Sequence, residues 1–180
     1  MQKIRAAVIG GSESGKTFRV MGYSRGLWAR RGLRSLVFDP WKGETDWGPQ
    51  AWVCKDFEKW RHVVANTSGC VIVWDEATAN GGRDRENVAL FSEIRHRHPV
   101  LFCIGHAYSV MLPVMRVNLT DLFISSADAR DADEWARVMR DPEVVEATKL
   151  GQYEFLHKRA FRPVRVLRDS ADQIRAGIVP

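Results

Sequence analysis

Five short runs along the chain consist mostly of apolar residues. They lie at 3–9, 35–38, 71–74, 100–104 and 121–125. Runs of this length that do not alternate regularly with polar residues are typical of strands buried on both faces of a parallel sheet. A shorter run at 51–54 predicts a further strand. The alternation in 152–157 and 163–167 predicts a hairpin near the C-terminus.

The segments between these runs place apolar residues at helical spacing. In the first of them Val20, Tyr23 and Leu27 share one helix face, and Gly32 is a suitable residue to end the helix. Strands that alternate with helices in this way predict an α/β fold with a mostly parallel central sheet flanked by helices. The predicted helices cover 16–31, 56–65, 86–95, 131–140 and 142–150, with a short helical or turn segment at 112–118.

Composition fits a single globular domain. The chain has 180 residues, of which 45% are hydrophobic, and we predict one domain over 1–180 with a basic tail at 158–180. No apolar run approaches the ~20 residues of a membrane span. The three cysteines are scattered, and two of them, Cys70 and Cys103, lie in apolar runs that suit buried reduced thiols of an intracellular protein. The net charge of +5 suits a polyanionic partner, although a basic solvated surface would give the same value.

A glycine-rich loop follows the first apolar run. Its sequence from Gly10 to Thr17 fits the phosphate-loop spacing G-x-x-x-x-G-K-[ST], and it lies between a predicted strand and a predicted helix, as this motif requires. Backbone N–H groups of such a loop face phosphate oxygens at the positive end of a helix. Lys16 would reach the β- and γ-phosphates, and the Thr17 hydroxyl would hold Mg²⁺. The residues predicted to bind nucleotide are Gly10, Gly11, Ser12, Glu13, Ser14, Gly15, Lys16, Thr17 and Phe18.

Two carboxylates end the apolar run at 71–74. Asp75 at the carboxyl end of this strand is predicted to hold Mg²⁺, directly or through water. Glu76 is placed to act as the base that polarises an attacking water. Acidic residues precede many helices, but downstream of a phosphate loop the pair indicates a Walker B motif and hence ATP hydrolysis.

A histidine follows the run at 100–104. His106 comes directly after Gly105, so its side chain is expected at the strand end that faces the ligand crevice. In that position it would sense the γ-phosphate. A strand-end histidine bonded to a backbone carbonyl would give the same pattern.

Four stretches together resemble the FtsK–HerA superfamily of P-loop ATPases, and within it the genome-packaging ATPases of tailless phages with an internal membrane. The resemblance spans residues 3–125, and the family usually has Gln or Asn where this chain has His106. The four stretches are the phosphate loop; Leu36-Val37-Phe38-Asp39-Pro40-Trp41-Lys42-Gly43-Glu44; Asp75-Glu76 with Ile94-Arg95-His96; and the strand that ends at His106, followed by Pro113, Arg116 and Asn118.

The resemblance implies a RecA-like fold of the additional-strand, catalytic-glutamate type. It also implies an ATPase that uses ATP and Mg²⁺, assembles into a ring, most often a hexamer, and moves double-stranded DNA of any sequence into a preformed capsid. Lys16, Glu76, Arg95 and His106 would be catalytic. Arg95 would act across a subunit interface, and Arg97, Arg116 and Arg85 are the alternatives for that role.

The same resemblance implies surroundings and partners. We expect the host cytoplasm or a virion vertex as the location, and portal or membrane proteins at a capsid vertex as docking partners. The loop at 77–85 and the arginine-rich tail are the candidate DNA contacts, because a packaging motor must grip phosphates without reading bases.

Three other functions remain open at this point. The chain would also fit a small nucleotide or metabolite kinase with Asp39 near the acceptor, a filamentous-phage-type assembly ATPase acting on coat proteins, or an ATP-gated binding module without motor function. An Asn-Lys-x-Asp stretch that would read guanine is absent, which argues against a GTPase.

Overall fold

The computed structural model describes residues 3–41, 46–77, 85–108, 111 and 113–168, with the side chains of 85–87 left out. Its strands are β1 (Ile4–Ile9), β2 (Ser35–Phe38), β3 (Ala51–Cys54), β4 (Val71–Trp74), β5 (Val100–Gly105), β6 (Asp121–Ile124), β7 (Glu154–Arg159) and β8 (Arg165–Arg168). Its helices are α1 (Lys16–Arg31), α2 (Phe57–Ala65), α3 (Arg85–Arg97), α4 (Pro113–Val117), α5 (Ala129–Met139) and the 3₁₀ helix η2 (Pro142–Lys149).

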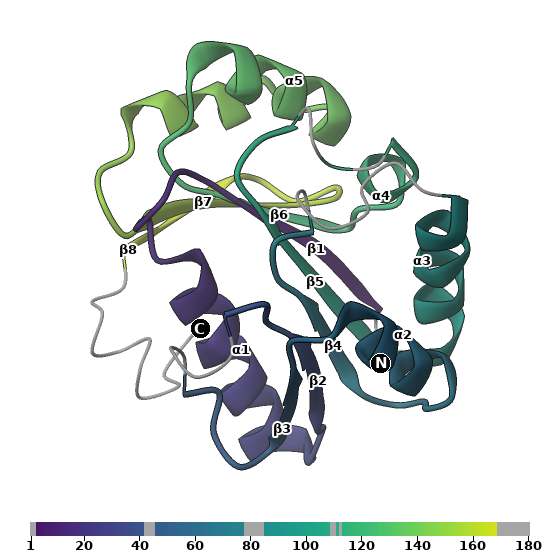
Figure 1. Cartoon of the computed structure of the whole chain (residues 1–180). Coiled ribbons are helices and arrows are strands. Elements are labelled where there is room, and N and C mark those ends of the chain that lie inside the picture. The colour runs from purple at the N-terminus through teal and green to yellow at the C-terminus, as the bar shows by residue number, and fades with distance from the viewer. Residues whose placement is uncertain (1–2, 42–45, 78–84, 109–110, 112, 169–180) are drawn as a thin grey trace.

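All eight strands form one sheet, in the order β3-β2-β4-β5-β1-β6-β7-β8 (Figure 1). The pairs from β3 to β6 are parallel, whereas β7 and β8 are antiparallel to their neighbours. The strand β5 lies between β1, which leads into the phosphate loop, and β4, which leads into the acidic pair. This inserted strand confirms the predicted additional-strand type, and β7–β8 is the predicted C-terminal hairpin.

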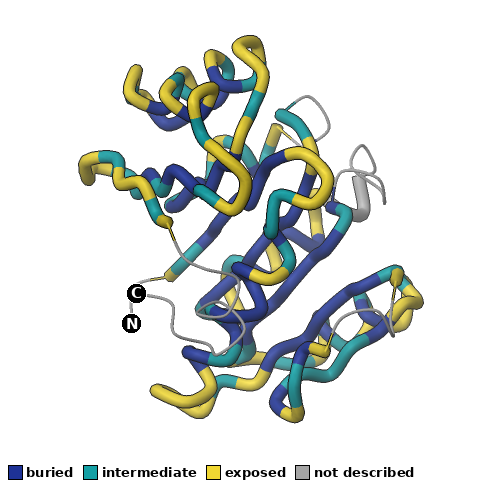
Figure 2. Tube along the Cα trace, turned by 90° about the vertical axis from the view of Figure 1, so that its left-hand side faces the viewer, coloured by how far each residue is buried: buried dark blue, intermediate teal, exposed yellow. Residues whose placement is uncertain are grey.

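Helices cover the two faces of the sheet unequally. On one face α1 packs Val20, Met21 and Leu27 against alternate residues of the strands, and Trp47 from the loop before β3 completes this layer. The other face is covered by α2, α3, α4, α5 and η2. The strands between these layers are buried, while the outer sides of the helices are exposed (Figure 2). None of the described helices combines the length and apolar composition needed to cross a bilayer.

Two predicted helices near the C-terminus differ from the structure. The segment predicted at 142–150 is a 3₁₀ helix, in which the Val144 N–H donates to the Asp141 carbonyl and the two residues are three apart. Val144 and Ala147, also three apart, are both buried, and three residues per turn place them on one side. The preceding helix begins two residues before Asp131, because the Asp128 carboxylate accepts the Asp131 N–H and caps it.

Candidate nucleotide site

The phosphate loop depends on glycine at two positions. A Cβ atom added to Gly10 would lie 1.9 Å from Ser125 Oγ, and one added to Gly15 would lie 2.9 Å from a ring carbon of Tyr153. Gly15 also has a φ of 88°, a left-handed conformation that favours glycine, and it starts α1. At Gly11 an added Cβ meets nothing within 4 Å. Gly10 and Gly15, the two glycines of the motif, therefore leave no room for a side chain, whereas Gly11 between them does.

Lys16 lies inside the curve of the loop. Its Nζ donates to the Gly10 carbonyl at 2.8 Å and to the Gly11 carbonyl at 2.5 Å. The side chain is buried, and this burial lowers the pKa of Lys16, while the charges of Asp75 and Glu76 oppose the shift. The ammonium is thus held next to the N-terminal end of α1, where unpaired N–H groups and the helix dipole favour an anion.

Asp75 and Thr17 converge from the ends of β4 and α1. The Thr17 hydroxyl donates to Asp75 Oδ2 at 3.3 Å, and the Glu76 N–H donates to Asp75 Oδ1 at 2.9 Å. Burial first, and then the neighbouring charges of Asp39 and Glu76, raise the pKa of Asp75 to about 6 against the two hydrogen bonds, which lower it. A buried carboxylate that is costly to ionise, next to a hydroxyl, fits a hard cation such as Mg²⁺.

Further observations at the loop fit a bound triphosphate. The hydroxyls of Ser14 and Ser125 are buried and have no hydrogen-bond partner among the described residues. Both lie beside Gly10. Among the described residues, neither here nor elsewhere is a group of three or more His, Cys, Asp and Glu side chains arranged to hold a metal ion on its own.

Glu76 and His106 meet at the ends of two neighbouring strands. Oε1 of Glu76 lies 3.0 Å from Nε2 of His106, and both side chains are partly exposed. Glu76 has a φ of 49°, which is strained for a residue other than glycine and turns the chain sharply after β4. The next N–H, that of Ala77, donates to the Ile104 carbonyl of β5 at 2.9 Å and ties this turn to the strand of His106.

Tyr153 belongs to the site, and the sequence analysis missed it. An open hollow of about 440 Å³ is lined by Glu13, Gly15, Lys16, Thr17, Phe18 and Tyr153. Because β7 runs antiparallel to β6, the turn before β7 lies next to the carboxyl ends of β1 and β6. Tyr153 is in this turn with a φ of 64°. Its only sequence signal is its place within a predicted hairpin strand at 152–157, which says nothing of the strand that β7 pairs with.

The turn that carries Tyr153 is braced by Glu154. The Gly151 N–H donates to Glu154 Oε2 at 3.0 Å, and Arg168 of β8 donates to Glu154 Oε1 at 2.8 Å. These two bonds, with the Gly151 N–H first, lower the pKa of Glu154. The aromatic ring is thus presented to the loop by a turn with its own support, opposite the exposed ring of Phe18.

Arg95 lies near the amino-terminal ends of the parallel strands, opposite the ends that carry the nucleotide site. It is in the last turn of α3, just before β5 begins, whereas the nucleotide site lies where β5 ends. Its Nη1 donates to Asn118 Oδ1 at 2.8 Å, and its carbonyl accepts from the Arg5 guanidinium at 2.7 Å. The structure therefore brings together Arg95 and Asn118, two residues of the family resemblance, but does not bring Arg95 to Lys16 of the same chain.

The alternatives to Arg95 are placed as follows. Arg97 donates to the Ala65 carbonyl at 2.6 Å, and the Arg116 guanidinium lies 4.1 Å from the centre of the Tyr108 ring. The Arg85 side chain, most of the loop predicted to contact DNA (78–84) and the end of the tail (169–180) lie outside the described residues. The rest of the tail, 158–168, is the end of β7, the hairpin turn and β8.

Asp39 has a structural role at the end of β2. It is 2% exposed, and its two carboxylate oxygens accept the Trp41 N–H at 2.9 Å and the Trp47 indole N–H at 3.0 Å. A carboxylate occupied and buried in this way is poorly placed to receive a proton from an acceptor substrate. This arrangement argues against the kinase alternative.

Together, the inserted strand β5, the phosphate loop and the acidic pair with Glu76 define a P-loop NTPase fold of the additional-strand, catalytic-glutamate type. No protein-family model matches the chain, and no curated protein matches it in sequence.

Solved structures give a more particular likeness. The genome-packaging NTPase B204 from Sulfolobus turreted icosahedral virus 2, in complex with sulfate, is similar with a TM-score of 0.76 and 16% identity over 93% of this chain and 96% of that one. The same protein in complex with AMPPCP gives a TM-score of 0.75 at 14% identity, over 93% of this chain and 97% of that one. The N-terminal domain of zonular occludens toxin from Neisseria meningitidis gives a TM-score of 0.57 at 14% identity, over 97% and 98% of the two chains. The resemblance predicted from the sequence is thus confirmed at the level of the fold.

Proposed function

We propose that this protein is an ATP-hydrolysing motor that translocates double-stranded DNA and packages a viral genome into a preformed capsid. The observation that supports it most is the placement of Glu76. Its carboxylate lies beside His106 at the end of the inserted strand, across from the loop that holds Lys16 and Thr17. A carboxylate base at this point suits transfer of the phosphoryl group to water.

The residues around the loop divide the chemistry between them. Lys16 and the N–H groups at the start of α1 bind and orient the phosphates. Thr17 and Asp75 would hold Mg²⁺, which would supply positive charge to offset the charge that develops on the transferred group. Glu76 accepts the proton of the attacking water, and His106 holds the Glu76 carboxylate in position.

The proposal includes a ring, most simply a hexamer, in which each site is completed by a neighbour. Arg95 lies near the amino-terminal ends of the parallel strands, and its own nucleotide site lies at their carboxyl ends. It would therefore act on the site of the next subunit. An arginine supplied across an interface couples hydrolysis to the position of the neighbouring subunit. We place this ring in the host cytoplasm or at a virion vertex, docked on portal or membrane proteins.

ATP turnover in the absence of any acceptor tests the hydrolytic part of this proposal. Lys16→Ala should lose both nucleotide binding and turnover. Glu76→Gln should keep nucleotide binding and lose turnover by a factor of about 10²–10⁴, the usual contribution of a positioned base. A Glu76→Gln variant that hydrolyses ATP at the wild-type rate would show that another group activates the water. A wild-type protein that consumes ATP only with an added acceptor would point to a kinase.

A further inference from the structure

The strands β6, β7 and β8 carry a polar cluster on their α1 side. Side chains alternate between the faces of a strand, and Asp121, His157, Arg159 and Arg165 all share this side. They lie where β6 begins, whereas Phe123 and Phe155 further along belong to the apolar layer under α1. Among the described helices only α1 packs on this face, so the polar end of these strands is not covered by a second helix.

Two adjoining hollows open over this cluster. The larger, of about 290 Å³, lies between α1 and the sheet and includes Arg30, Arg31, Arg159 and Arg165 in its lining. The smaller, of about 180 Å³, shares Arg159 and Arg165 and adds Arg162. We call the surface formed by Arg30, Arg31, Arg159, Arg162 and Arg165 the arginine groove. Aromatic rings line its floor and contact one another in the order Phe102, Tyr23, Phe123 and His157.

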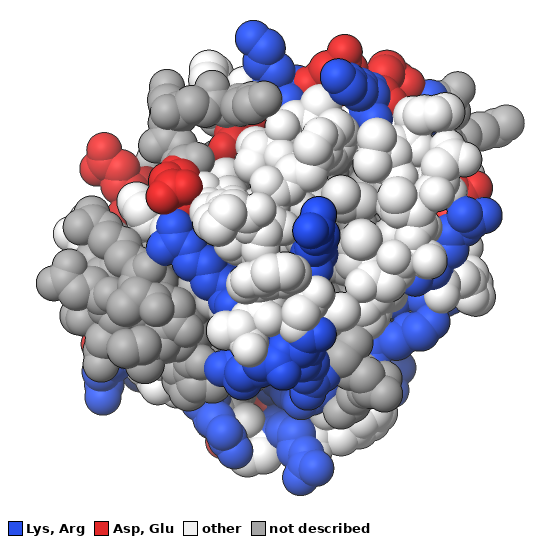
Figure 3. All heavy atoms as spheres, turned by 90° about the horizontal axis from the view of Figure 1, so that it is seen from below, with Lys and Arg blue, Asp and Glu red and all other residues white. Residues whose placement is uncertain are grey.

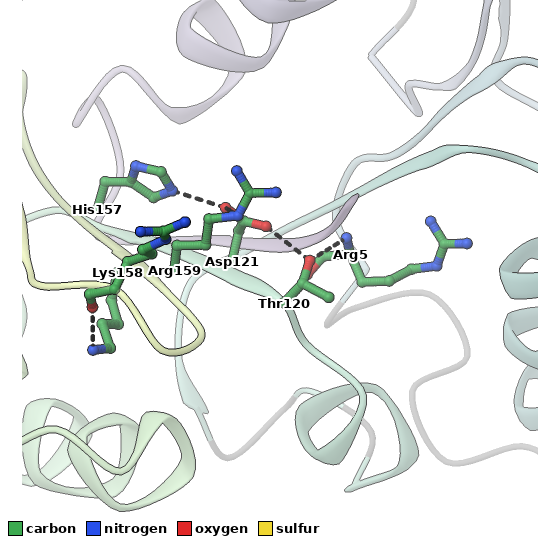
Figure 4. A network of polar contacts seen from close by, with 7 residues as sticks. Arg5, Thr120, Asp121, His157, Lys158 and Arg159 are labelled. Carbon is green, nitrogen blue, oxygen red and sulfur yellow. Dashed lines mark hydrogen bonds and ion pairs between the residues drawn. The ribbon is translucent and has the colours of Figure 1, made fainter. Parts of the chain in front are cut away.

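The carboxylate in this lining is already occupied. Asp121 is 4% exposed; it accepts the Thr120 hydroxyl at 2.7 Å and contacts His157 Nε2 at 2.9 Å (Figure 4). The Arg159 Nε lies 3.8 Å from the same carboxylate. The network continues from Thr120 to the Arg5 N–H at the start of β1, at 2.8 Å. Asp121 therefore positions His157 and Arg159 and leaves the remaining arginines without an acidic neighbour in the lining.

Those remaining arginines are free cations at the surface. Arg30, Arg31, Arg162 and Arg165 are exposed, and none of them forms an ion pair with another described residue. Seen from below, several groups of Lys and Arg side chains lie in the centre and lower part of the face, while most of the visible Asp and Glu side chains lie in its upper part (Figure 3). Unpaired like charges brought together from α1, the hairpin turn and β8 repel one another, so a bound polyanion would relieve that cost.

We propose that the arginine groove binds the phosphate backbone of double-stranded DNA. This inference rests on the proposed function and names the surface that performs its DNA-binding step. Cations drawn from separate elements and spread over two hollows suit a row of phosphates better than one small anion. Because a packaging motor meets DNA of every sequence, we expect these arginines to contact phosphates and not base edges.

The groove is separate from the nucleotide site. Arg30 and Arg31 end α1 and Lys16 begins it, and a helix of 16 residues is roughly 24 Å long. The cluster at Asp121 lies where β6 begins, while Ser125 beside the phosphate loop lies just after β6 ends. Substitutions in the groove should therefore change DNA binding and leave ATP binding and basal turnover unchanged.

The test is the salt dependence of duplex DNA binding, measured with the full chain. The groove variant carries Arg30→Gln, Arg31→Gln and Arg165→Gln. Its matched control carries Arg130→Gln, Arg137→Gln and Lys149→Gln, which remove the same charge from exposed positions on α5 and η2 across the sheet. Each phosphate contact contributes about 0.9 to the slope of log affinity against log salt. The fall in affinity between about 50 mM and about 200 mM salt should thus be about 40-fold smaller for the groove variant than for wild type.

The outcomes separate this inference from the function it rests on. It is supported if the control keeps the wild-type slope while the groove variant loses nearly three units of slope and binds ATP normally. It is overturned if wild type binds DNA and the two triple variants lose equal slope, or lose none. If wild-type protein binds no duplex DNA at all, the proposed motor function fails as well.

Discussion

Nε2 of His106 lies 3.0 Å from Oε1 of Glu76, although the two residues follow different strands. The contact exists because β5 is inserted between β1 and β4, so that the residue after β5 stands next to the turn after β4. Glu76 is further constrained by its φ of 49° and by the bond from the next N–H to β5. His106 thus contacts the Glu76 carboxylate from the end of β5, the strand that lies between β4 and the strand of the phosphate loop.

Replacing His106 should slow hydrolysis more than it weakens ATP binding. A hydrogen bond to a charged group is worth roughly 1.5–3 kcal/mol, so His106→Ala should lower kcat by about 10- to 100-fold. His106→Gln can still donate a hydrogen bond to Glu76 and should retain most of the activity. Steady-state kinetics of the two variants with a separate measurement of ATP affinity provides the check. Equal loss in both variants would mean that the imidazole itself, not its hydrogen bond, is needed.

The raised pKa of Asp75 predicts a pH dependence of both stability and Mg²⁺ use. Folding raises this pKa from 3.8 to about 6, so the folded apoprotein holds the proton more tightly than the unfolded chain. The resulting contribution to stability is fully present below pH 3.8 and is lost as the pH rises through about 6. Mg²⁺ binds the ionised carboxylate, so Mg²⁺-dependent ATP affinity should increase over the same interval.

Titration calorimetry of MgATP binding from acidic to neutral pH would measure this effect. Asp75→Asn cannot titrate, so its weaker affinity should show no change centred near pH 6. A wild-type affinity that is flat over this range would contradict the assignment of Asp75 to the metal.

Substitution of Gly10 by alanine should destabilise the protein more than the same substitution at the neighbouring Gly11. In Gly10→Ala the new methyl group would overlap Ser125 Oγ, which overpacks a buried contact and should cost about 1–3 kcal/mol. Gly11→Ala places its methyl group in open space and serves as the matched control. Thermal unfolding of the two variants, followed by ATP binding, distinguishes them. Equal melting temperatures would mean that the backbone moves to accommodate the methyl group.

Tyr153 should contribute to binding of the nucleoside rather than of the phosphates. It faces the loop from the hollow that also contains Phe18, where an adenine or ribose could pack against the rings. Stacking of a base on an aromatic side chain is worth about 1–3 kcal/mol, so Tyr153→Ala should weaken ATP binding by about 5- to 150-fold. Binding of inorganic tripolyphosphate is the internal control and should change little. A parallel loss for both ligands would place Tyr153 on the phosphates instead.

Mixing experiments can test whether Arg95 acts across an interface. Lys16→Ala and Arg95→Ala subunits should each be inactive alone. Mixed rings contain interfaces where an intact Lys16 meets an intact Arg95 from a neighbour, so some ATP turnover should return on mixing. Asn118→Ala, which removes the cis partner of Arg95, controls for a purely structural loss. A mixture that stays inactive, although the subunits are shown to co-assemble, would exclude the trans role.

The sequence predicted the parts of this protein that follow from local pattern. The apolar runs fixed most strands, and the loop from Gly10 to Thr17 and the pair Asp75-Glu76 lie at the strand ends where they were expected. The contact of Glu76 with His106 was not predicted, because it depends on the spatial order of β4, β5 and β1. The roles of Tyr153 and of the Asp121 cluster could not be predicted, because both arise from pairing of β7 with β6, which leaves no mark in local spacing.

Burial also changed the interpretation of residues that looked catalytic. Asp39 follows a strand just as Asp75 does, and the sequence left it open as a residue near the acceptor of a kinase. The structure separates them through Trp47, which reaches back from the loop before β3 to occupy the Asp39 carboxylate. At Asp75 the hydrogen bond comes from the Thr17 hydroxyl, which can also bind a metal ion.

The rate of ATP hydrolysis by wild-type protein, measured with and without linear duplex DNA at a fixed concentration, tests the motor proposal most directly. The account predicts a basal rate that rises when DNA is added and rises equally for DNAs of unrelated sequence. A basal rate that does not change with any duplex DNA, in protein that has assembled into rings, would contradict it.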